Sequence, residues 1–183
     1  MNTWVCVASG PSLTREDCIL VEESQLPVIA VNSSWEMIPG CQYVYAGDHT
    51  WWAANFNDVP ADKCRFTSVH ATATQFSINY FEPPVRGSFN SGQRAILLAK
   101  HLGAKRIILL GYDCSLKAGI HWHGKHGRGL RNPDADSLKR WRGEFRQVLP
   151  LVGEGNIINC SRHTELDMFQ VGNLEEELCK SFL

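Results

Sequence analysis

The chain has 183 residues, 44% of them hydrophobic, and a formal net charge of −1, which predicts one globular domain over residues 1–183. The near-neutral charge argues against binding nucleic acid or membranes through a broad basic surface. No apolar run approaches the roughly 20 residues that span a bilayer, and the N-terminus lacks the pattern of a secretion signal. The seven cysteines form no CxxC pair, which is typical of reduced thiols, so we expect a cytoplasmic protein.

Short apolar runs typical of strands recur along the chain, at residues 3–8, 27–31, 42–46, 64–69, 107–110 and 156–159. Helices are expected after Thr14, near Ser33, over 95–102, from Asp134 or Asp136 to about Val148, and over 174–182. The segment 71–87 contains Pro83-Pro84 and is expected to be irregular. This order predicts an α/β fold: a single three-layer domain with a mainly parallel, Rossmann-like sheet.

Small polar residues follow the first three predicted strands, in the segments SGPS, NSS and GDHT. Because the carboxyl ends of parallel strands meet at one edge, where open α/β sheets bind ligands, we expect these segments to share a site. The candidate nucleotide contacts among them are Ser9, Gly10, Pro11, Ser12, Asn32 and Asp48. The first loop matches neither GxxxxGK[ST] nor GxGxxG, so an ordinary tight turn is the alternative, as a helix cap is for Asn32.

The segment 88–113 is the clearest helix–strand unit in the chain. Asn90, Ser91 and Gly92 form a turn-prone start to the helix, and Gly103 is a typical helix stop. The run at 107–110 is apolar throughout, as expected for a strand buried on both faces. Tyr112 and Asp113 then follow at its carboxyl end. Asp113 is either a turn former or, like Asp48, a carboxylate that meets a ligand or metal.

Residues 114–136 are predicted to form a long loop, rich in glycine, histidine and basic residues. Its histidines, His121, His123 and His126, are candidate general bases because imidazole titrates near neutral pH. Zinc binding and a solvated surface loop are the alternatives, although HxHxxH is not a recognised zinc pattern. The candidate phosphate or acceptor contacts of this loop are His121, Lys125, Arg128 and Arg131.

Several motifs resemble the bacterial sialyltransferase-like superfamily and its relative, the hydroxymethylpterin pyrophosphokinase domain family. They are SGPSL, VNSSW, NSG before the helix, LGAKRIILLGYD, HWHG, RNP, Trp141 and NCS. In this order they are most similar to small phage and prophage proteins related to those families. The resemblance covers nearly the whole chain, and each motif is short. It implies the sialyltransferase-like version of the predicted fold.

The resemblance also implies roles for individual residues. Ser9, Gly10, Pro11, Ser12 and Asn32 would line the nucleotide site, and Asn90 and Ser91 would contact the donor, with Tyr112 and Asp113 facing the same pocket. A histidine of the following loop would be the general base on the acceptor hydroxyl, with His123 and His126 first and His121 next. The tyrosine pair that supports the leaving phosphate in sialyltransferases has no match here. The pyrophosphokinase relatives need a divalent metal, which Asp48 and Asp113 would hold.

The expected function is therefore a transferase that uses a nucleotide-activated donor, with glycosyl transfer of the sialyltransferase-like type and a histidine base. The alternatives are a Mg²⁺-dependent pyrophosphokinase or phosphotransferase, and a non-catalytic, phage-encoded nucleotide-binding protein. Expected partners are a nucleotide or nucleotide-sugar and a small-molecule or glycan acceptor. The donor, the acceptor, a need for Mg²⁺ and the formation of homo-oligomers remain open at this point.

Overall fold

The computed structural model describes residues 2–87, 90–124 and 132–181. Over these residues the chain forms one eight-stranded sheet, in the order β5-β4-β3-β2-β1-β6-β7-β8, with every strand pairing parallel. The strands are β1 (Thr3–Val7), β2 (Val28–Val31), β3 (Tyr43–Tyr45), β4 (Cys64–Thr67), β5 (Asn79–Tyr80), β6 (Arg106–Leu110), β7 (Ile157–Asn159) and β8 (Gln170–Val171). The predicted α/β class and parallel, Rossmann-like sheet are confirmed.

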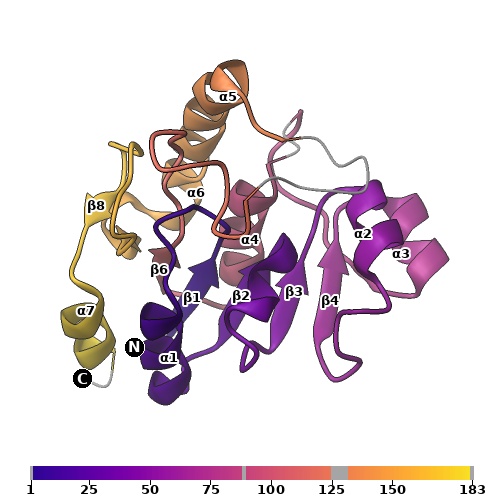
Figure 1. The fold of residues 1–183 in the computed structure, drawn as a ribbon, viewed down its shortest axis with the longest axis horizontal. Helices are drawn as coiled ribbons and strands as arrows, with labels where there is room; N and C mark the ends of the chain where they lie inside the picture. The colour runs from indigo at the N-terminus through magenta and orange to yellow at the C-terminus, as the bar shows by residue number, and fades with distance from the viewer. Residues whose placement is uncertain (1, 88–89, 125–131, 182–183) are drawn as a thin grey trace.

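The helices alternate with the strands along the chain (Figure 1). They are α1 (Arg15–Ser24), α2 (His49–Asn55), α3 (His70–Phe76), α4 (Ser91–His101), α5 (Ala135–Arg146), α6 (Leu149–Val152) and α7 (Leu174–Lys180), with 3-10 helices η1 (Asn32–Glu36) and η2 (Glu154–Asn156). None of the helices in the described part of the chain has the length and apolarity needed to cross a membrane.

Helices cover both faces of the sheet and make a three-layer arrangement. Alternate residues of β1 point to opposite sides: Cys6 joins a core formed with α4, α5 and α6, whereas Val5 joins a core formed with α1, α2 and α7. In β6, Leu109 belongs to the first of these cores and Ile108 to the second. Because both faces are buried, the central strands are apolar throughout, which is why the sequence revealed them.

The six predicted strands are confirmed, each with ends within two residues of those observed. Two expectations are wrong. The segment 71–87 is not irregular throughout, since it contains most of α3 and all of β5. The run at 156–159 is not the last strand, since β8 follows it. Helix α3 begins without a side-chain cap, and the two residues of β8 are exposed, so neither element carries an apolar or capping signal.

The order of the strands places a topological switch point between β1 and β6. From β1 the chain builds the sheet outward to β5, crosses back through α4 to β6 on the other side of β1, and continues outward to β8. At such a point the two connections leave in opposite directions and open a crevice at the carboxyl ends of the strands. In Figure 1 the strand arrows point toward this edge, beyond which α5 lies.

Candidate functional site

A cavity of about 510 Å³ lies over the carboxyl ends of β1 and β6. Its walls come from the segments after β1, β2 and β3, from the start of α4, from the end of β6 and the loop after it, and from α5. Eleven of the residues singled out by the sequence line it: Ser9, Gly10, Pro11, Asn32, Asp48, Asn90, Ser91, Gly92, Tyr112, Asp113 and His121. Segments that lie far apart in the sequence therefore meet at one site, as the strand-end pattern predicted.

The remaining predicted residues fall into two groups. Ser12 and His123 are described but do not line the cavity. Lys125, His126, Arg128 and Arg131 lie outside the described residues. The HxHxxH pattern is therefore only partly described, and the zinc alternative stays untested. Among the residues that the structure does describe, no group of three or more His, Cys, Asp or Glu side chains could hold a metal ion.

The loops after β1 and β6 approach each other closely. The Gly10 amide donates to the Gly111 carbonyl oxygen at 2.8 Å, and the Ala8 amide donates to Leu110 at the same distance. A Cβ atom on Gly10 would lie within 3.0 Å of both Asp113 Oδ1 and the Gly111 carbonyl oxygen. Gly111 has a φ of +68°, and its Cβ would meet the Ala8 carbonyl. Both positions therefore require glycine.

Asp113 supports the loop after β1. Its side chain is 1% exposed. The carboxylate accepts the Ser12 amide at 2.9 Å through Oδ2 and the Ser12 hydroxyl at 2.7 Å through Oδ1. Burial raises the pKa of Asp113, while the hydrogen bonds from Ser12 and the charge of His163 oppose that rise. Both carboxylate oxygens are thus already engaged by the protein, and Ser12 acts through Asp113 rather than at the cavity wall.

Asn32 offers the cavity a buried hydrogen-bond acceptor. It starts η1 with a φ of +50°, a left-handed conformation that asparagine tolerates better than most residues. Its side chain does not cap this helix, which excludes the capping alternative. The Oδ1 atom is buried and has no hydrogen-bond partner among the described residues. Buried polar atoms are nearly always paired, with protein groups or with ordered water.

The start of α4 forms the floor of the cavity beside Tyr112. Asn90 caps the helix by accepting the Gln93 amide at 3.1 Å, and the Ser91 hydroxyl accepts the amide of Gly47, which follows β3, at 3.0 Å. The Tyr112 hydroxyl donates to the Gly92 carbonyl at 3.0 Å. The predicted helix start is therefore confirmed, and the positive end of an 11-residue helix faces the cavity.

Asp48 belongs to both the cavity and α2. Its side chain is exposed, and Oδ1 caps α2 by accepting the Thr50 amide at 2.7 Å. Trp51, in the first turn of the same helix, is 2% exposed and also lines the cavity. Trp51 belongs to the core on this side of the sheet as well as to the cavity wall.

The histidine loop folds back onto the loop after β1. His121 Nδ1 lies 2.9 Å from the Ser9 hydroxyl oxygen, and the Trp122 amide donates to the Ser9 carbonyl at 3.0 Å. The His121 and His123 rings stack with their centroids 5.0 Å apart. Burial lowers the pKa of His123, which the Glu36 carboxylate partly opposes. Of the two histidines, His121 is the one that lines the cavity.

Sequence reasoning missed one wall of the cavity as a functional surface. The sequence predicted this helix, α5, but its apolar residues have different surroundings: Phe145 is buried in the core, whereas Leu138 and Trp141 are half-buried at the cavity. The further lining residues on this side are Cys114, Ser115, Leu116, Ile120, Pro133, Ser137, Arg140, Glu144 and Leu166. The available signal was the long loop before α5, which returns the chain to the same edge of the sheet.

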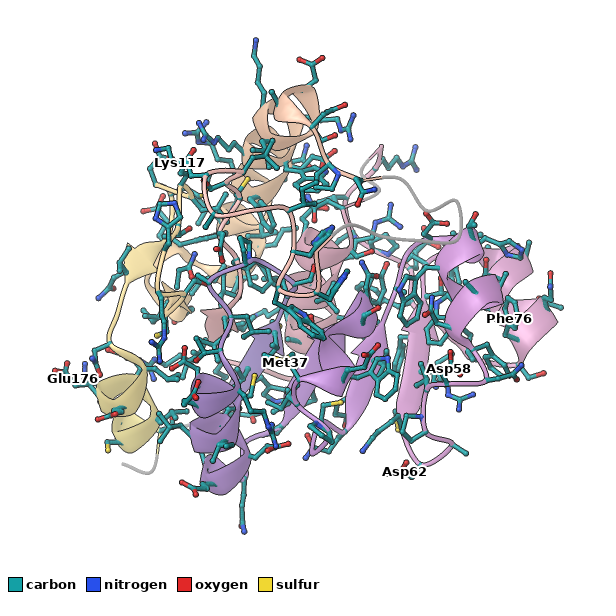
Figure 2. All side chains as sticks on the ribbon, viewed as in Figure 1. Met37, Asp58, Asp62, Phe76, Lys117 and Glu176 are labelled. Atoms are coloured by element: carbon teal, nitrogen blue, oxygen red, sulfur yellow. The ribbon has the colours of Figure 1, made fainter. Side chains whose placement is uncertain are left out.

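A network around Glu165 holds the beginning of the loop. Glu165 accepts the Ser115 hydroxyl at 3.0 Å, lies 3.1 Å from the Lys117 ammonium, and pairs with Arg142 of α5. Lys117 lies on the outer surface of the loop (Figure 2). These interactions, those from Lys117 first, lower the pKa of Glu165. They connect the loop, α5 and the segment before β8 at the side of the cavity.

Comparisons with protein-family models, with curated proteins and with solved structures find no match to this chain.

Proposed function

We propose that the protein is a transferase that uses a nucleotide-activated donor, with glycosyl transfer of the sialyltransferase-like type as its reaction. The observation that supports this most strongly is the convergence of the segments after β1, β2 and β3 with the start of α4 and the end of β6 around one cavity. In open α/β sheets this crevice is where nucleotides and related ligands bind. The proposed reaction needs a site for phosphate, a site for the nucleoside and a base.

The phosphate is proposed to lie at the start of α4, near Ser91 and Gly92. Both residues line the cavity, and the amide groups of a helix start attract anions. The nucleoside is proposed to lie toward Asn32, whose buried Oδ1 would accept a hydrogen bond from a base amine or a ribose hydroxyl. The helix start would also stabilise the charge that develops on the leaving phosphate.

His121 is the proposed general base, in place of His123, because it lines the cavity. If Nδ1–H donates to the Ser9 hydroxyl oxygen, then Nε2, which is buried in this structure, is the nitrogen proposed to accept the proton. In the reaction Nε2 takes the proton of the acceptor hydroxyl, and the acceptor oxygen bonds to the anomeric carbon of the donor. The bond from that carbon to the phosphate oxygen breaks, and its electron pair leaves with the nucleotide.

A Mg²⁺-dependent pyrophosphokinase is the second candidate, because Asp48 and Asp113 both line the cavity. Magnesium bound with nucleotide phosphates needs as few as one or two carboxylates. Since Ser12 engages both oxygens of Asp113, Asp48 is the better fit to such a metal. A bound Mg²⁺ would neutralise charge on the transferred phosphate. A non-catalytic nucleotide-binding protein is the third candidate.

The test is a thermal-shift screen with CMP, UDP, GDP, ATP and a CMP-sugar, each with and without Mg²⁺. A ligand that binds the folded state raises the melting temperature by mass action. We expect a shift with at least one nucleotide. Shifts that require Mg²⁺ would favour the pyrophosphokinase, and the absence of any shift would contradict both enzymatic candidates. Binding without turnover, unchanged in His121→Ala, would favour the non-catalytic protein.

The location of the site is tested with Ser91→Trp, which places a large side chain in the cavity and should abolish the nucleotide shift. Ile19→Trp is the matched control, because Ile19 is 41% exposed on α1 and does not line the cavity. An unchanged shift in Ser91→Trp would show that the nucleotide binds elsewhere.

A further inference from the structure

We propose that the α5 side of the cavity binds a planar apolar ring of the ligand, an assignment that rests on the proposed function for the rest of the ligand. The α5 side is defined by Leu116, Ile120, Leu138 and Trp141, which line the cavity from α5 and from the loop that precedes it. It lies opposite the strand-end side, where the segments after β1 and β2 provide Ser9 and Asn32.

The first observation is the apolar surface left open on this side. Leu116, Ile120, Leu138 and Trp141 are all half-buried, although the fold buries comparable side chains of α4 and β6 almost completely. Four apolar side chains gathered at one concavity keep apolar surface in contact with water, which is unfavourable by about 25 cal/mol for each Å². A ligand that covers this surface recovers that free energy. Trp141 also packs on the core cluster, which holds its ring in place.

The second observation is that polar side chains on this side already have partners within the protein. The Ser115 hydroxyl donates to Glu165 at 3.0 Å, and the Ser137 hydroxyl donates to Asp134, the cap of α5, at 2.7 Å. Glu144 is paired with Arg140 of the same helix, with the charged atoms 3.6 Å apart. The hydroxyl groups of Ser115 and Ser137 are therefore engaged within the protein, which favours an apolar group over a sugar next to them.

The third observation is the polar character of the strand-end side. There, Asn32 carries a buried acceptor without a partner among the described residues, and the start of α4 presents its amides. A ligand that satisfies both sides has a polar, anionic part and a flat apolar part. Trp141 supplies an aromatic side chain, and Tyr112 and Phe145, whose rings pack edge to face, also line the cavity.

Two sources can supply such a ring: the base of the donor nucleotide, or an aromatic portion of the second substrate. The probes that separate them are CMP, ribose 5-phosphate and 8-anilinonaphthalene-1-sulfonate. Ribose 5-phosphate has the polar part without a base, and the naphthalene probe has an aromatic body without a nucleotide. Binding of the first two is measured by calorimetry, and that of the third by fluorescence.

The test compares the wild type with Trp141→Ala, and uses Leu151→Ala as the control, since Leu151 is 39% exposed on α6 and does not line the cavity. We expect Trp141→Ala to weaken an aromatic probe roughly tenfold, as the loss of one stacking partner would, and to leave ribose 5-phosphate unchanged. If CMP weakens and competes with the naphthalene probe, the base occupies the α5 side. If Trp141→Ala binds CMP as tightly as the wild type does, and the wild type binds CMP and the naphthalene probe at the same time, the second substrate provides the ring.

The assignment is overturned if both aromatic probes bind Trp141→Ala as they bind the wild type, or if neither binds the wild type. If the naphthalene probe depends on Trp141 while CMP and ribose 5-phosphate do not bind at all, the proposed function fails and the ring site stands. Should Trp141→Ala lose its cooperative melting transition, Leu116→Asn replaces it. Leu116 lies in the loop, so this change introduces a polar group on the α5 side without altering a helix.

Discussion

The loops that follow β1 and β6 leave neighbouring parallel strands at the same edge of the sheet, yet they are held in different ways. The loop after β1 covers residues 8–14 and is fixed by backbone hydrogen bonds from Ala8 and Gly10 to the β6 side. Gly10 in this loop lies so close to Asp113 and Gly111 that no side chain fits at its position. The loop after β6 is described over residues 111–124, and beyond Asp113 side chains provide much of its attachment.

This difference suggests a division of work between the two loops. A short loop with several backbone bonds and a close approach presents a preorganised surface, as a phosphate or nucleoside site requires. The longer loop is attached through Ser115 and Lys117 to Glu165, and through His121 to Ser9. Single substitutions remove such attachments, so the part of the cavity wall that this loop forms is open to adjustment. The predictions below test this contrast, beginning with the contact that joins the two loops.

The largest effect is expected from Gly10→Ala. Its Cβ would lie within 3.0 Å of Asp113 Oδ1 and of the Gly111 carbonyl, and neither atom can withdraw without breaking hydrogen bonds between the loops. We expect a loss of about 3 kcal/mol in the free energy of unfolding, measured in urea. The matched control is Gly143→Ala in α5, where the added Cβ meets no atom within 4 Å. That control should be neutral or slightly stabilising, because alanine favours helix.

A loss in Gly10→Ala no greater than in an exposed loop substitution would contradict the rigid contact. The nucleotide shift adds a second readout. Gly10→Ala should reduce it even at temperatures where the variant is folded, whereas Gly143→Ala should not.

A smaller effect is expected from Asp113→Ala, which leaves the Ser12 amide without its acceptor. Loss of a buried hydrogen-bond partner costs about 2 kcal/mol, and urea unfolding would measure it. Asp113→Asn is the control, since it retains one oxygen for the Ser12 amide and should recover most of the loss. Equal losses in both variants would mean that the charge of Asp113, rather than its hydrogen bonds, supports the loop.

Asp113→Asn is also the control for a dependence of the free energy of unfolding on pH. Burial raises the pKa of Asp113 above its ordinary value of 3.8, so the folded state holds this proton more tightly than the unfolded state. The stabilising contribution is therefore complete below the unfolded pKa and is lost as the pH rises through the folded pKa. The stability of the wild type relative to Asp113→Asn should fall as the pH rises above 3.8 and through the raised pKa of the folded state. A constant or rising difference would contradict the raised pKa.

The central sheet and the strand-end side of the cavity could be predicted from the sequence because each rests on a local pattern. The buried strands are apolar throughout, and SGPS, NSS and GDHT follow three of them, so parallel pairing alone brings these segments together. Element β8 and helix α3 could not be predicted in this way. The former is two exposed residues long, and the latter starts without a capping side chain.

The sequence also did not predict which groups the site residues bind within the protein. Asp113 follows a strand in a manner that suits catalysis, metal binding or a turn, and only the fold shows that Ser12 engages both of its oxygens. The sequence ranked His123 and His126 above His121 as the candidate base, whereas the described histidine that lines the cavity is His121. Which histidine lines the cavity depends on how the loop after β6 folds back. His121 contacts Ser9 in the loop after β1, which lies 112 residues away in sequence. Such long-range contacts leave no local signal.

The smallest effect on stability is expected from Ser9→Ala, which removes the side-chain bond between the two loops. Because one neutral hydrogen bond is lost at a half-buried site, we expect a change of about 1 kcal/mol or less. Its effect on His121 should be larger, since the partner of Nδ1 selects the tautomer of the ring. The measurement is the pair of ¹⁵N resonances of His121, assigned by comparison with His121→Gln. In the wild type one tautomer should dominate, whereas in Ser9→Ala the two shifts should move toward each other.

Ser9→Thr keeps a hydroxyl at this position and should preserve the wild-type resonances, which separates the hydrogen bond from a general disturbance of the loop. If Ser9→Ala leaves the tautomer unchanged, the loop after β6 is positioned by its other attachments, and the two loops are less dependent on each other than their contacts suggest. If the tautomer changes while the nucleotide shift persists, the strand-end side is independent of the histidine loop. Loss of a single hydrogen bond would then alter the histidine loop and leave the strand-end side unaffected, as expected if the first is adjustable and the second is rigid.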